Sequence, residues 1–160
     1  YFGFRLTYGA GPLSLAYGYG NSKGNSGNGN VKYNNLAGSF DLGAVKPMAQ
    51  WAQEKQQSGA KVTGWLIGVT VPLGQGEFRT AYSDYNLEGV NATVNKNDWK
   101  KFAIGYGYNL SKRTQIYATY AKVSNDGAAT VSVANNGLSA GAASAGGSST
   151  GYEMGIRHAF

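Results

Sequence analysis

The sequence contains no cysteine, which excludes a disulfide framework and a thiolate metal site. Charged residues make up 14% of the chain, against roughly 25% in soluble domains. No run of about 18 consecutive apolar residues occurs, so a transmembrane helix is excluded. A membrane-spanning β-barrel is not excluded, because its strands need an apolar residue only at every second position.

The charge that is present is mostly positive, with a formal net charge of +6. An excess of positive charge is compatible with binding to nucleic acid, anionic lipid or anionic solutes. The Lys and Arg residues are scattered singly, apart from short pairs such as Lys100-Lys101 and Lys112-Arg113. A nucleic-acid-binding surface needs clustered bases. We therefore expect no nucleic-acid partner.

Alternation of apolar and small or polar residues is the dominant pattern. It is clear from the start of the chain, where the apolar positions are Phe2, Phe4, Leu6 and Tyr8. The same period recurs down to the C-terminus and predicts about nine strands. Residues 46–56 also fit a helix with Pro47 in its first turn, but the neighbouring segments favour a strand there.

Two further features indicate the class of β-protein. Short turns, such as the one at Gly9–Pro12, alternate with longer polar connections, such as 21–30 and the one between Gln53 and Trp65. The apolar face carries aromatic residues near strand ends, and the opposite face carries Gly, Ala, Ser, Thr and isolated charges. A soluble β-sandwich, the alternative, would place large side chains inward and polar groups outward. The pattern predicts an all-β, transmembrane antiparallel β-barrel.

The odd number of predicted strands indicates that these strands alone do not close a barrel. Bacterial barrels have even strand numbers and close antiparallel. An open edge in lipid would leave unpaired backbone groups that cost several kcal/mol each. We therefore expect further strands, before Tyr1.

Two segments carry a family resemblance. The chain ends in Gly155-Ile156-Arg157-His158-Ala159-Phe160, and residues 105–117 read as a strand, a Leu110-Ser111-Lys112-Arg113-Thr114 turn and a second strand. Both are similar to the C-terminal half of Gram-negative general porins of the betaproteobacterial (comamonad and neisserial) type. The resemblance extends over essentially the whole chain in order.

This resemblance implies a porin barrel of roughly 16 strands, assembled as a homotrimer in the bacterial outer membrane. Residues 1–160 would be the C-terminal portion of that single barrel domain. The constriction loop of the family would lie in the N-terminal half. The terminal Phe160, with Tyr152, Met154 and Ile156 at alternate positions before it, resembles the signal read by the outer-membrane assembly machinery.

With the apolar face toward lipid, the opposite face becomes the pore wall. Its predicted charged residues are the bases Arg5, Lys46, Arg79, Lys101 and Arg157 and the acids Asp41, Glu77 and Glu153. An excess of bases favours anions in a pore. Arg5 and Arg79 are the strongest candidates because both lie well inside strands, whereas Arg157 and Lys46 lie near the periplasmic rim, where an ordinary solvated charge is the favoured interpretation. In the alternative interpretation, these bases are ordinary wall residues paired with the acids.

The aromatic residues of the apolar face fit a second role. We expect interfacial girdles formed by Trp51, Trp65, Tyr17, Tyr19, Tyr108 and Tyr152. Sugar stacking is the alternative, and the interleaved aliphatic residues argue against it. Tyr85 has the other parity and is expected to face the lumen.

No catalytic constellation emerges from the sequence. The single histidine, His158, has the apolar parity, and nothing brings Glu77 and Glu153 together as a carboxylate pair. We expect no enzyme, no cofactor and no metal, but a channel for passive diffusion of small hydrophilic solutes, preferably anions. The alternatives are a barrel enzyme, which needs converging acids or nucleophiles at one rim, and an adhesin or receptor acting through loops 21–30, 86–98 and 124–150. The loops are rich in Gly, Ser and Asn, which disfavours a rigid binding surface.

Overall fold

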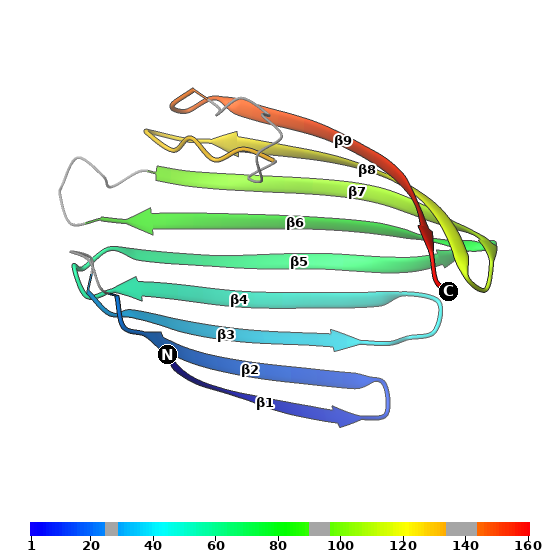
Figure 1. The fold of residues 1–160 in the computed structure, drawn as a ribbon, viewed down its shortest axis with the longest axis horizontal. Coiled ribbons are helices and arrows are strands. Elements are labelled where there is room, and N and C mark those ends of the chain that lie inside the picture. Colours follow the sequence, from blue (N-terminus) through cyan, green and yellow to red (C-terminus); the bar gives the residue numbers. More distant parts are fainter. Residues whose placement is uncertain (25–28, 90–96, 134–143) are drawn as a thin grey trace.

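In the computed structural model, residues 1–24, 29–89, 97–133 and 144–160 are described. The regular elements in these ranges are β-strands (Figure 1). In chain order they are β1 (Phe2–Ala10), β2 (Leu13–Ser22), β3 (Val31–Phe40), β4 (Lys46–Gln56), β5 (Lys61–Leu73), β6 (Gly76–Glu88), β7 (Asn97–Ser111), β8 (Thr114–Asn125) and β9 (Ser148–His158).

The strands form one antiparallel nine-stranded sheet in which each strand pairs with its neighbours in the chain. The order β1 to β9 is visible as a continuous meander in Figure 1, with the two termini at opposite ends of the strands. The prediction of about nine antiparallel strands is confirmed, and residues 46–56 are strand rather than helix. No helix in the described ranges is long and apolar enough to cross a membrane.

The strand register places the apolar residues on one face. Directly opposed residues of an antiparallel pair share a face. One row across the sheet joins Leu6, Tyr17, Leu36, Trp51 and Trp65. The adjacent row, on the other face, joins Arg5, Gly18, Asn35, Ala52 and Gly64. The alternation predicted from the sequence therefore gives an apolar face and a polar face that continue across all nine strands.

The connections define two rims. At the short-turn rim, residues 11–12, 41–45, 74–75 and 112–113 join successive strands. Gly11 and Gly74 turn the chain there with positive φ angles of 54° and 61°, which glycine adopts without steric cost. At the long-loop rim, the connections are 23–30, 57–60, 89–96 and 126–147.

One of these connections corrects the sequence analysis. A long connection was expected between Gln53 and Trp65, but β4 and β5 extend toward each other and only residues 57–60 join them. The alternation of short and long connections therefore fails at this point. Polar residues such as Lys55 and Lys61 continue the ladder, because a strand end that leaves the lipid has no need of apolar side chains.

The sheet has almost no conventional core. Among the described residues, the buried hydrophobic side chains are Val123, 1% exposed, and Ala129, 7% exposed. Large residues of the apolar face are open, including Tyr152 at 82% and Met154 at 83%. No second sheet covers that face in the described ranges. This arrangement argues against the soluble sandwich, which would bury these residues between two sheets.

Candidate functional site

Four of the predicted wall charges line one broad hollow on the polar face. It extends from β4 to β9. The polar-face residues that line it are Lys46, Met48, Thr70, Glu77, Arg79, Ala81, Ala103, Gly105, Gly107, Gln115, Tyr117, Thr119 and Arg157. Most are charged, hydroxylated or glycine, so the hollow is suited to water and polar solutes.

The hollow on the polar face measures about 930 Å³, and a separate hollow on the apolar face measures about 660 Å³.

Register brings three of the predicted wall charges into one row. Lys46 on β4 lies opposite Thr70, which lies opposite Arg79 on β6. The row continues through β7 and β8 to Glu153 on β9. Neighbouring strands are about 4.8 Å apart, so Lys46 and Arg79 are separated by about 10 Å across the sheet.

Arg79 is neutralised by an acid two positions before it. Its Nη2 forms an ion pair with Glu77 Oε1. The arginine side chain is 60% exposed and the glutamate side chain 29%. Within the described ranges, neither Lys46 nor Arg157 forms an ion pair with a carboxylate. The two bases nearest the short-turn rim therefore keep their charge uncompensated.

A second acid, Glu153, lies beside the hollow and is held by Tyr117, a lining residue that the sequence analysis missed. The Tyr117 hydroxyl donates a hydrogen bond of 2.8 Å to Glu153 Oε1. Tyr117 lies between Gly107 and Gly155 on the neighbouring strands, and a Cβ at Gly155 would lie 2.8 Å from the tyrosine oxygen. The two glycines leave room for the tyrosine ring. The sequence alone does not show that they flank Tyr117, because the pairing depends on the strand register.

The other predicted wall residues lie away from the hollow. Arg5 is exposed on β1 opposite Gly18, and Lys101 on β7 lies opposite Ser83 and Val123. Asp41 follows β3 at the short-turn rim, where its Oδ1 accepts a 2.9 Å hydrogen bond from the Gly43 amide. The structure thus gathers Lys46, Glu77, Arg79, Glu153 and Arg157, and leaves Arg5, Lys101 and Asp41 separate.

The chain that follows β8 folds back over the polar face. Asn125, 9% exposed, accepts from the Val131 amide and donates to the Val131 and Gly147 carbonyls, each at 2.9 Å. Val133 lies over Gly151, where a Cβ would meet its methyl group at 2.7 Å. The Val133 amide donates a hydrogen bond to Ser149, the residue directly opposite Val123, so this segment lies beside the 1%-exposed Val123 side chain.

Two aromatic rings also lie on the polar face. Tyr85, predicted to face the lumen, stacks on Trp99 with ring centroids 5.5 Å apart and an angle of 6° between the ring planes. The tyrosine ring leans over Gly64, its partner on β5, and occupies the space where a Cβ would stand.

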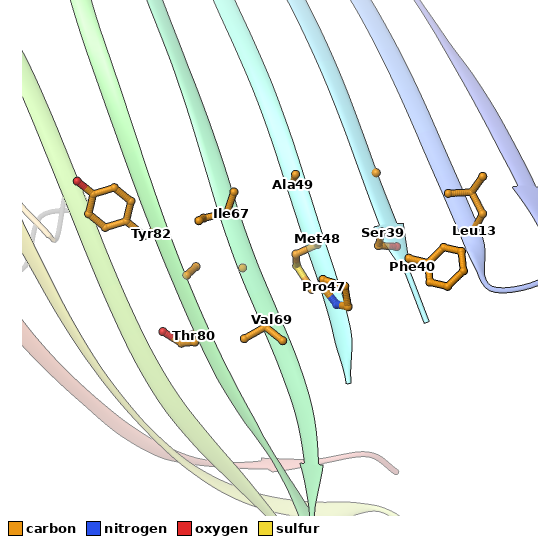
Figure 2. A pocket seen from close by; sticks show the side chains of 13 residues that line it. Leu13, Ser39, Phe40, Pro47, Met48, Ala49, Ile67, Val69, Thr80 and Tyr82 are labelled. Carbon is orange, nitrogen blue, oxygen red and sulfur yellow. The ribbon is translucent and has the colours of Figure 1, made fainter. Parts of the chain in front are cut away.

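The apolar face carries the aromatic residues expected of a girdle. Trp51 and Trp65 are directly opposed, and Trp65 contacts Tyr82 with ring centroids 5.6 Å apart. Figure 2 shows the 660 Å³ hollow nearby, which is lined largely by aliphatic and aromatic side chains from β2 to β6. Its chemistry suits hydrocarbon rather than ions.

The C-terminal residues proposed as an assembly signal lie on the same face. Ile156 is 71% exposed and Phe160 fully exposed. His158 contacts the Phe160 ring edge-on, with centroids 5.1 Å apart, and its Nδ1 lies 2.9 Å from Thr114 Oγ1. In the part of the chain that the structure describes, no three His, Cys, Asp or Glu side chains are grouped to hold a metal ion.

Comparison with known proteins extends these observations. The sequence profile of a Gram-negative porin family matches residues 1–128. Outer membrane porin protein 32 of Delftia acidovorans is 31% identical across the whole chain, which covers 46% of that relative. An outer membrane porin of Bordetella pertussis is 25% identical, over 73% of this chain and 39% of its own length.

Solved structures agree with the sequence relatives. The anion-selective porin from Comamonas acidovorans superposes with a TM-score of 0.84 at 31% identity, covering 98% of this chain and 48% of that one. OmpT of Vibrio cholerae, at 15% identity and a TM-score of 0.72, shares the fold. The chain therefore spans about half the length of the relatives it matches.

These relatives bear on the alternatives left open by the sequence. The curated relatives and the Comamonas structure are porins, which are channels rather than enzymes. They give no support to an adhesin or receptor. Residues 25–28, 90–96 and 134–143 of the loops considered for that role lie outside the described residues.

Proposed function

Because the chain belongs to the Gram-negative porin family of the outer membrane, we propose that the protein forms a water-filled channel for passive diffusion of small hydrophilic solutes, with anions favoured. In this proposal, residues 1–160 are the C-terminal portion of a single barrel domain. The apolar face contacts outer-membrane lipid, and the polar face lines the pore.

The observation that carries the anion preference is the unequal pairing of the charges that line the polar hollow and of Glu153 beside it. Glu77 is engaged by Arg79, and Glu153 by the Tyr117 hydroxyl. Lys46 and Arg157 have no ion-pair partner among the described residues. A wall that presents unpaired positive charge concentrates anions and lowers the barrier to their passage.

Two further bases add to this field from other parts of the polar face. Arg5 and Lys101 project from β1 and β7, whereas Asp41 is used in a turn at the rim. The Comamonas relative, at 31% identity, is described as anion-selective. Both points support a preference for anions.

The proposal includes two protein partners. The chain assembles as a homotrimer, as general porins do, and its exposed C-terminal strand is read by the outer-membrane assembly machinery. The exposure of Tyr152, Met154, Ile156 and Phe160 on one face of β9 and the residues after it supports this role. No reaction and no cofactor are involved.

The test is the reversal potential of the complete protein, as the cell makes it, in a planar bilayer under a salt gradient. We expect stepwise conductance with a reversal potential displaced toward that of the anion. Lys46→Gln combined with Arg157→Gln should reduce the displacement. Lys112→Gln is the control, because Lys112 lies in the β7–β8 turn outside the hollow.

The other outcomes separate the parts of the proposal. A cation-directed reversal potential would keep the channel and overturn the role of the bases. An absence of conductance from correctly folded protein would overturn the channel itself.

A further inference from the structure

Three lysines form a continuous row on the apolar face at the long-loop rim. Lys32 on β3 lies directly opposite Lys55 on β4, and Lys55 lies directly opposite Lys61 on β5. The row is at the rim where β3 begins and β4 ends, on the left in Figure 1. Like charges directly opposed across strands destabilise a sheet, so an arrangement of three in succession calls for a compensating anion.

The chain supplies too few carboxylates to compensate this row. All eight acidic residues lie in the described ranges. Glu88 pairs with Lys61 at 2.6 Å. Of the other seven, Asp41 is at the short-turn rim, Glu54 has the opposite parity to Lys55, and the rest lie on β6 to β9 or in the β8–β9 connection. Lys32 and Lys55 therefore lack an acidic partner within the described ranges.

Trp51 and Trp65 indicate the depth of the lysine row in the membrane. Lys55 follows Trp51, and Lys61 precedes Trp65, by four positions on paired strands. Four residues of strand extend about 13 Å, which a tilt of about 45° reduces to about 9 Å along the membrane normal. Trp side chains lie at the headgroup level, so the ammonium groups reach the layer just outside it.

The lipid headgroup layer at the long-loop rim carries phosphate groups. The long loops of bacterial barrels face the cell exterior, where the outer leaflet of the Gram-negative membrane is built from a phosphorylated glycolipid. Lysine binds phosphate as a compact point charge. Strands about 4.8 Å apart present the three ammonium groups as a line along the membrane surface.

We propose that Lys32, Lys55 and Lys61 form a binding site for the phosphate groups of the outer-leaflet glycolipid. Bound phosphate relieves the repulsion along the row and fixes this part of the barrel in the leaflet. The inference rests on the outer-membrane location of the family and is separate from the channel's ion selectivity, since these lysines are on the lipid-facing side.

The test compares the thermal unfolding of the complete protein in detergent micelles with and without diphosphorylated lipid A. We expect lipid A to raise the unfolding temperature of the wild type. Lys32→Gln combined with Lys55→Gln should lose most of that increase. Lys112→Gln removes one positive charge at the opposite rim, away from the lysine row, and should respond as the wild type does.

Two reference additives identify the source of the phosphate. Dephosphorylated lipid A tests apolar contact alone, and inorganic phosphate tests a free-anion site. The proposal is overturned if either stabilises the wild type as much as lipid A does, or if the double variant keeps the full response. An unchanged reversal potential in the double variant distinguishes this site from the pore wall.

Discussion

Tyr117 on β8 and Glu153 on β9 are joined by a hydrogen bond of 2.8 Å in which the phenol donates to the carboxylate. The two residues are not directly opposed, since Tyr117 pairs with Gly155 and Glu153 with Thr119. The tyrosine reaches the acid by leaning across Gly155, where a side chain would obstruct it. Glu153 is thereby held against the polar face of the sheet.

Opposite effects on selectivity follow from this contact. Glu153→Gln removes a negative charge from the polar face and should increase the anion preference. Tyr117→Phe keeps the charge but removes its donor, so we expect a smaller shift toward cations. Reversal potentials in planar bilayers measure both. A Tyr117→Phe shift in the same direction as that of Glu153→Gln would contradict the role assigned to the tyrosine.

The Arg79–Glu77 ion pair predicts compensation between two substitutions. Glu77→Gln leaves Arg79 unpaired and should raise the anion preference. Arg79→Gln leaves Glu77 unpaired and should lower the anion preference. The double variant has the wild-type net charge and should return close to the wild-type reversal potential. A double variant further from wild type than either single variant would show that the pair acts through pore shape and not through charge.

Gly64 offers a test of packing on the polar face. A Cβ at this position would collide with the Tyr85 ring, and relieving that collision would disturb the stack on Trp99. We expect Gly64→Ala to destabilise the folded protein by about 1–3 kcal/mol and to change the tryptophan fluorescence. Gly18→Ala is the matched control, because Gly18 lies in the same register row with open space around it. Equal unfolding midpoints for the two variants would rule out the proposed collision.

The fold was largely predictable because alternation is a local property. Each strand carries its own pattern, so the period around Phe4 or Ile104 predicts strand and face without any knowledge of partners. The β4–β5 connection was mispredicted because Lys55 and Lys61 are polar on the apolar face. Hydrophobicity marks the part of a strand within lipid, whereas hydrogen bonding continues beyond it.

The site was less predictable, because its pairings depend on register and side-chain reach. The sequence identifies Lys46, Arg79 and Glu153 as wall charges, but nothing local shows that one row contains all three. The Tyr117–Glu153 contact spans 36 positions in the chain. The lysine row likewise joins residues on three strands and appears only when β3, β4 and β5 are aligned.

Asn125 provides the last prediction, because its side chain fixes the segment that folds over the polar face. It satisfies both the amide and the carbonyl of Val131, and losing a buried partner costs about 1–3 kcal/mol. Asn125→Ala should therefore accelerate hydrogen exchange at the Val131 amide and increase the single-channel conductance as the segment leaves the wall. Asn34→Ala, which removes a side-chain contact with Tyr17, should do neither. Faster exchange without greater conductance would mean that the segment lies beside Val123 but does not narrow the pore.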